Sequence, residues 1–147
     1  MLGKIKKFDE NLYNKYDIPA RELLKSKLGD KIKDNPDIYA EDMLINDPDC
    51  KYKFLEIQAC AEWIGEKYPH DKPFVFERKG YFNDKTLFIL FDKHLTKALL
   101  FAKTSLEETP VRTKKYSRYY KYEVPWNKVT TVYMENFSME DIYLFQL

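Results

Sequence analysis

The sequence has few glycines, few cysteines and no long hydrophobic run. Its 147 residues include four glycines, none of them in a glycine-rich phosphate loop, which argues against P-loop NTPases and Rossmann-type dehydrogenases. Its two cysteines make no disulfide scaffold, and its apolar stretches fall far short of the roughly 18–20 residues that span a bilayer. The basic N-terminus lacks the apolar core of a secretory signal. We therefore expect a soluble intracellular protein with no membrane partner.

The composition is that of a folded globular protein. Hydrophobic residues make up 44% of the chain, aromatic residues 16% and charged residues 33%. Together with the length, these values predict one domain over residues 1–147. The four potential zinc ligands lack the short spacings of local zinc sites, and nothing around either cysteine marks it as a nucleophile; they are Cys50, Cys60, His70 and His94.

Charge is balanced overall, at a net +1, but it is unevenly distributed. Residues 34–49 contain six acids and no Lys or Arg, whereas residues 112–121 contain five bases and no acid. Either run alone is typical of a solvated face. Their presence in one domain makes a metal site combined with a polyanion-binding segment worth testing.

Periodicity predicts a helix first and then mainly strands. Leu23, Leu24 and Leu28 share one helical face after Pro19, and Gly29 ends the pattern, so we expect a helix over 19–28. Residues 43–45 and 52–58 are predicted to form a β-hairpin across an Asn-Asp-Pro-Asp turn. Segment 59–72 has a helical or irregular pattern. Three strands in a meander are predicted next, then two more strands and a C-terminal piece capped by Ser138; the strands are 74–78, 86–91, 98–102, 122–126 and 129–133. The fold class is α/β or α+β, with an N-terminal helix and a mixed central sheet flanked by helices.

The hairpin carries the strongest candidate site. Asp42 heads its first strand, and pairing can bring it beside Glu56 on the second. Strand side chains alternate, so Gln58 shares the face of Glu56. Two neighbouring carboxylates suit Mg²⁺, which also binds substrate phosphate oxygens and can activate a water for attack on a phosphodiester. Glu22, on the predicted helix, is a candidate outer-shell carboxylate if the helix packs across these strands.

This arrangement resembles the PD-(D/E)XK nuclease superfamily, whose core is a helix followed by a β-hairpin that carries an acid and then a D/E-x-K. The resemblance covers the chain from the helix to Gln58, and Glu56-Ile57-Gln58 stands where Glu-x-Lys would be. It implies that Asp42 and Glu56 bind Mg²⁺ or Mn²⁺ and that Gln58 positions the attacking water. The lysine charge would come from Lys79 or from a second metal ion, or the site is inactive.

The identity of the first acid has an alternative. In this superfamily the acid often follows a proline, and Pro48-Asp49 supplies that pair seven positions before Glu56. We favour Asp42 because 43–45 continues it as a strand, whereas residues 46–49 have turn chemistry. Asp49 is the fallback.

Nucleic acid is the predicted partner, with DNA favoured. The basic segment interleaves tyrosines with cations, a composition that binds phosphates by charge and bases by stacking. Arg78 would contact a phosphate if its strand adjoins Glu56. A homodimer would suit cleavage of both strands of a duplex. The candidate nucleic-acid contacts are Arg78, Arg112, Lys114, Lys115, Tyr116, Arg118, Tyr119 and Lys121.

Two functional hypotheses compete with catalysis. A nuclease fold that has lost activity would bind nucleic acid without cutting it, which Gln58 and the near-neutral net charge favour. A protein-interaction domain would use the tyrosine-rich surface to bind a protein.

Overall fold

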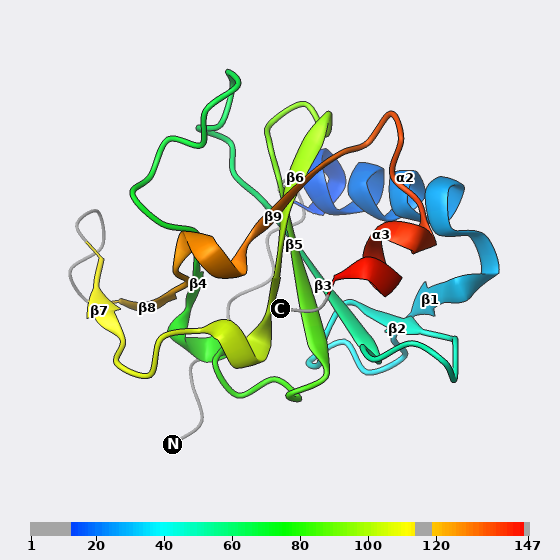
Figure 1. Ribbon diagram of the computed structural model, residues 1–147, viewed down its shortest axis with the longest axis horizontal. Coiled ribbons are helices and arrows are strands. Elements are labelled where there is room, and N and C mark those ends of the chain that lie inside the picture. Colours follow the sequence, from blue (N-terminus) through cyan, green and yellow to red (C-terminus); the bar gives the residue numbers. More distant parts are fainter. Residues whose placement is uncertain (1–12, 114–118, 146–147) are drawn as a thin grey trace.

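The structure is a computed structural model that describes residues 13–113 and 119–145. A six-stranded sheet has the order β1-β2-β3-β5-β6-β9, and a second sheet has the order β4-β8-β7. Figure 1 shows the second sheet on one side of the large sheet and two α-helices on the other. The larger sheet comprises β1 (Ile32–Asp34), β2 (Met43–Ile45), β3 (Phe54–Ala59), β5 (Thr86–Phe91), β6 (Lys97–Ala102) and β9 (Thr130–Tyr133); the smaller comprises β4 (Phe74–Phe76), β7 (Val111–Arg112) and β8 (Tyr120–Glu123); the helices are α2 (Ile18–Leu28) and α3 (Met139–Leu144).

The large sheet is mixed, as the sequence predicts. β1, β2 and β3 are successively antiparallel, β3 and β5 are parallel, and β5, β6 and β9 are again antiparallel. A parallel pair needs a crossover connection. Here residues 60–85 make that crossover, and they contain β4 and the 3₁₀ turn η3 (Glu77–Lys79). The expected helix-plus-mixed-sheet class is confirmed.

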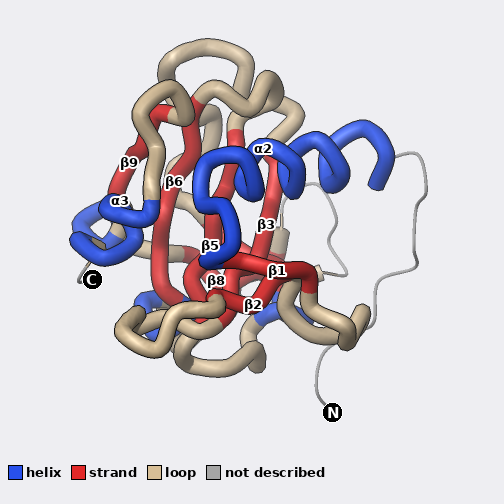
Figure 2. Tube along the Cα trace, turned by 90° about the vertical axis from the view of Figure 1, so that its right-hand side faces the viewer, coloured by secondary structure: helices blue, strands red, loops and turns tan. Residues whose placement is uncertain are grey.

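Helix α2 begins and ends close to the predicted limits. Pro19 lies in its first turn, where the missing N–H costs nothing. Ala20, Leu24 and Leu28 are buried along one side of the helix, and Figure 2 shows α2 crossing a face of the large sheet. Gly29 follows with φ at 60°, a left-handed conformation that glycine adopts without steric cost. The C-terminal piece that Ser138 was predicted to cap forms α3, and Asp141 accepts a hydrogen bond from the Ser138 backbone N–H at its start.

Both faces of the central strands are covered, which explains why β5 is an uninterrupted apolar run from Leu87 to Phe91. All six of its residues are buried. Leu87 and Ile89 face the core under α2 and α3, whereas Phe88 and Leu90 face the core beneath the second sheet. A strand that is buried on both faces has no polar alternation.

Two expected strands in the middle of the chain are corrected, and the irregular alternative for segment 59–72 is the one that forms. The predicted strand 74–78 ends at Phe76 and belongs to the second sheet, because it pairs with β8 rather than joining a meander with β5. The predicted strand 122–126 is β8, which ends at Glu123 before Pro125. Segment 59–72 is irregular apart from the last residue of β3. No helix in the described residues is long and apolar enough to cross a membrane.

Candidate active site

Asp42 and Glu56 meet at the end of the β2–β3 hairpin, as the strand pairing predicts. The register pairs Met43 with Leu55, so Asp42 and Glu56 come one step further along. The Asp42 backbone N–H donates to Glu56 Oε1 at 2.9 Å, and the Ile57 backbone N–H donates to Asp42 Oδ2 at 2.9 Å. Each carboxylate therefore accepts a hydrogen bond from the backbone on the opposite side of the hairpin. These two bonds hold the Asp42 and Glu56 side chains together just past Met43, the last paired residue of β2 on this side.

Helix α2 reaches this site through Arg21 rather than through Glu22. Arg21 Nη2 lies 2.8 Å from Asp42 Oδ1, and Nη1 donates to the Asp42 carbonyl oxygen at 3.1 Å. Arg21 also bonds Asp34 at 3.1 Å. Glu22, one position further along the helix, is exposed. The periodicity of the sequence did not mark Arg21 as a site residue, although Arg21 directly precedes Glu22, the carboxylate that was expected there.

Lys79 supplies the cation that the Glu-Ile-Gln segment lacks. Its Nζ lies 2.9 Å from Glu56 Oε2 and 3.4 Å from Gln58 Oε1. The alternation of β3 places Glu56 and Gln58 on the face toward the second sheet, and η3 brings Lys79 against that face. The Gln58 Nε2 atom is buried and has no hydrogen-bond partner in the described part of the chain. An unsatisfied buried donor costs free energy, so it is a natural contact for a ligand oxygen.

The electrostatics of the site centre on Glu56, which is only 5% exposed. The pKa of its carboxyl group is raised from 4.5 to about 7: burial is the largest cause, the Lys79 ammonium opposes the shift, and the Asp42 charge adds to it. A carboxylate in a water-poor site loses hydration that one cation does not fully replace. Glu56 therefore changes charge near neutral pH, the range in which a group that handles protons is most effective.

Asp42 and Glu56 are the two described carboxylates at this site that could hold a single Mg²⁺ ion. Each carboxylate oxygen of Asp42 and Glu56 accepts one hydrogen bond or ion pair and keeps a further lone pair. Mg²⁺ is commonly bound by one or two carboxylates, with waters and phosphate oxygens completing its shell. The Asp42 side chain, at 23% exposure, is the accessible one of the two. Among the described residues no group of three or more His, Cys, Asp or Glu forms a larger metal site.

Arg78 lies in η3, directly after β4 of the second sheet, and the described basic residues Arg112 and Lys121 lie on β7 and β8 of the same sheet. β4 does not join β3, so Arg78 reaches the site through η3 and not along an adjoining strand. Burial lowers the pKa of Arg78, and the Glu56 charge opposes that shift. β8, which carries Lys121, pairs with β4, and Arg112 on β7 donates to the Tyr120 hydroxyl at 2.9 Å. Residues Lys114, Lys115, Tyr116 and Arg118 of the predicted contacts lie outside the described residues.

The fallback acid and the zinc-ligand candidates lie elsewhere. Asp49 is exposed in the turn between β2 and β3, seven positions from Glu56 along the chain, and its N–H bonds the neighbouring Asp47 carboxylate. Cys50 is buried in the core under α2, whereas Cys60 packs against the other core. These positions favour Asp42 as the partner of Glu56.

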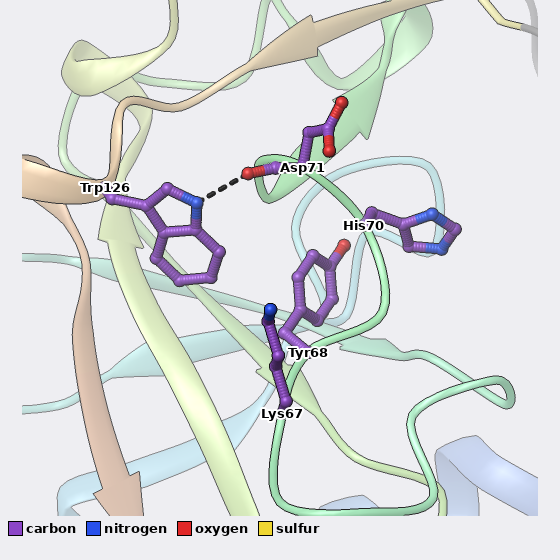
Figure 3. Close-up of a pocket in the computed structure, with 5 residues that line it drawn as sticks. All are labelled: Lys67, Tyr68, His70, Asp71 and Trp126. Carbon is purple, nitrogen blue, oxygen red and sulfur yellow. Dashed lines mark hydrogen bonds between the residues drawn. The ribbon is translucent and has the colours of Figure 1, made fainter.

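A pocket of about 420 Å³ lies apart from the two acids. Figure 3 shows Tyr68 between Trp126 and His70, with Lys67 and Asp71 beside them. The Trp126 indole N–H donates to the Asp71 carbonyl oxygen at 2.6 Å, and this bond fixes the ring. No pattern in the sequence groups these residues, because their grouping depends on how the fold brings Trp126 next to residues 67–71.

Comparison with known proteins leaves the family undetermined. No protein-family model, no curated protein and no solved structure matches this chain.

Proposed function

We propose that the chain is a divalent-metal-dependent nuclease that hydrolyses phosphodiester bonds of nucleic acid at Asp42, Glu56, Gln58 and Lys79. The position of Lys79 carries the proposal. A Glu-x-Gln segment lacks the cation of a Glu-x-Lys site, and here Lys79 Nζ stands 2.9 Å from Glu56 and 3.4 Å from Gln58. A helix, an acid before β2 and an acid on β3 complete the set that the PD-(D/E)XK resemblance implies.

The residues have separable roles in this mechanism. Asp42 and Glu56 would hold Mg²⁺ or Mn²⁺, which lowers the pKa of a bound water and offsets phosphate charge. Gln58 would donate from its unsatisfied Nε2 to the attacking water or to a phosphate oxygen. Lys79 would stabilise negative charge that develops on the phosphate, since a fixed cation in a water-poor site needs no reorganisation.

Arg21 and Arg78 support these groups from two sides. Arg21 bonds both the carboxylate and the carbonyl oxygen of Asp42, which holds this acid toward β3. Arg78 is placed by η3 beside Lys79, and a guanidinium is well matched to a phosphate.

A second candidate function is a nucleic-acid-binding module of the same architecture without catalysis. The observation that favours it is that each acid already has a cation partner, Arg21 for Asp42 and Lys79 for Glu56. Binding of a metal would have to weaken these ion pairs.

Cleavage assays with isosteric variants separate the two. Purified protein is incubated with supercoiled plasmid, linear duplex, single-stranded DNA and RNA, each with Mg²⁺, Mn²⁺ or EDTA. Asp42→Asn and Glu56→Gln are expected to abolish metal-dependent cleavage, and Lys79→Met to reduce it by about 10²-fold or more. Asp49→Asn is the matched control, because Asp49 is an exposed acid of the same hairpin.

Each outcome of these assays supports or contradicts one of the two candidate functions. Cleavage that is lost with EDTA, Asp42→Asn and Glu56→Gln but kept with Asp49→Asn supports the nuclease. Binding that weakens with salt, without cleavage of any substrate, supports the binding module. Cleavage that survives Glu56→Gln contradicts the proposed site. If Asp49→Asn abolishes cleavage and Asp42→Asn does not, the first acid of the site is Asp49 and not Asp42.

A further inference from the structure

The outer face of the second sheet carries aromatic rings that neither core uses. On β4, Val75 is fully buried beneath the sheet, so Phe74 and Phe76 lie on the opposite face by strand alternation. Both are partly exposed, and neither belongs to either hydrophobic core. In an ordinary sheet the face turned away from the core is polar.

These rings form part of a continuous row. Ring centroids are 5.6 Å apart for His70 and Phe74, 5.8 Å for Phe74 and Phe76, and 6.5 Å for Phe76 and Tyr119. All three pairs are edge-to-face. We call His70, Phe74, Phe76 and Tyr119 the aromatic track. Its last member, Tyr119, is 44% exposed.

Cations accompany the track. Lys121 Nζ lies 4.6 Å from the Phe74 ring centre, and the Arg78 guanidinium lies 5.4 Å from that of Phe76. Rings that stack on bases, interleaved with cations that bind phosphates, are the two components of a single-strand binding surface.

The two ends of the track favour the same ligand. At one end His70 also lines the 420 Å³ pocket, where Tyr68 lies 5.4 Å from His70 and 5.9 Å from the 44%-exposed Trp126 (Figure 3). Pockets of about 300–1,000 Å³ accept small organic groups, and this one offers ring faces together with a carboxylate and an ammonium for hydrogen bonding. Toward the other end, the residues that follow Phe76 form η3, which places Lys79 against Glu56.

We propose that the aromatic track binds single-stranded nucleic acid, with bases stacked on its rings and one base in the 420 Å³ pocket that Trp126 and His70 line. Bases in a duplex are stacked on one another and present only their edges in the grooves, so they cannot use these rings. The η3 turn connects the Phe76 part of the track with Lys79 at the Asp42–Glu56 site, so a strand bound on the track would be held next to the turn that supplies this site's cation. Delivery to that site rests on the proposed nuclease function, whereas binding to the track does not.

Fluorescence anisotropy in EDTA tests binding without cleavage. The probes are a labelled 15-nucleotide oligo(dT) and a labelled 15-base-pair duplex. The protein is expected to bind the single strand more tightly than the duplex. Phe76→Leu and Tyr119→Leu each remove a ring but keep apolar bulk, and each should weaken single-strand binding roughly 5- to 150-fold, the range found when a stacking ring is removed.

The matched control is Tyr143→Leu. Tyr143 is 40% exposed, close to the 44% of Tyr119, but lies on α3 on the other side of the large sheet. This variant is expected to bind oligo(dT) like the unaltered protein, and circular dichroism checks that all variants fold. The proposal is overturned if the protein binds the duplex as tightly as the single strand or more tightly. It is also overturned if Phe76→Leu and Tyr119→Leu both bind oligo(dT) as tightly as Tyr143→Leu does.

The outcomes distinguish this proposal from the nuclease. Ring-dependent binding of oligo(dT) without cleavage of any substrate refutes the nuclease alone. If single-stranded and duplex substrates are cleaved equally in a metal-dependent way, and the ring substitutions do not change binding, the proposed role of the aromatic track is refuted while the nuclease is retained.

Discussion

Glu56→Gln is expected to remove a pH dependence from the stability of the protein. The substitution keeps the shape of the side chain and an oxygen to accept the Asp42 backbone N–H, but it removes the titrating carboxyl group. Burial raises the pKa of Glu56 to about 7 from 4.5. Between these two values the folded chain binds more protons than the unfolded chain, so the free energy of unfolding falls as pH rises.

The size of the effect follows from linkage. The contribution of a carboxyl group with a pKa of about 7 when folded and 4.5 when unfolded is largest below pH 4.5 and is lost as pH rises through 7. Between pH 5 and pH 8 it amounts to about 2.5 kcal/mol. The unaltered protein should therefore lose about 2.5 kcal/mol more stability over this range than Glu56→Gln.

Urea unfolding at pH 5, 6, 7 and 8 measures this difference, with tryptophan fluorescence from the buried Trp63 and the partly exposed Trp126 as the signal. Glu22→Gln is the matched control, because Glu22 is an exposed acid on α2, and it should follow the unaltered protein at each pH. An identical pH dependence for Glu56→Gln and the unaltered protein would refute the reasoning that burial dominates the ionisation of Glu56.

Two further substitutions test the supports of the site. Gly80→Ala should destabilise the fold by about 1–3 kcal/mol in urea unfolding, because the new Cβ would lie 2.5 Å from a ring carbon of Tyr122. Gly65→Ala, whose Cβ would meet nothing within 4 Å, should change stability far less, and equal effects would contradict the steric argument. Arg21→Lys should cost about 1–2 kcal/mol in the same assay, because an ammonium cannot bond both the carboxylate and the carbonyl oxygen of Asp42 as the guanidinium does. Full retention of stability would show that this contact contributes nothing.

The local elements could be predicted because their signals are local. Pro19 and Gly29 mark the ends of α2 through their own backbone preferences, and Asn-Asp-Pro-Asp marks the turn between β2 and β3. Strand alternation in turn put Glu56 and Gln58 on one face. The meander was wrong because the sequence of β4 does not say which strand it pairs with, and pairing with β8 depends on residues more than 40 positions away.

By itself, the sequence determined the helix, the hairpin and the adjacency of Asp42 and Glu56, since helix-end residues, turn residues between two apolar runs and strand alternation are all local signals. Only the tertiary structure decided which cations meet these acids. Arg21 comes from α2 and Lys79 from η3 in the crossover, 21 and 23 residues from their respective partners, and their positions depend on how two cores pack against opposite faces of β5. The same packing leaves Phe74 and Phe76 on an outer face, because the sheet that carries them buries only Val75 of β4 beneath it.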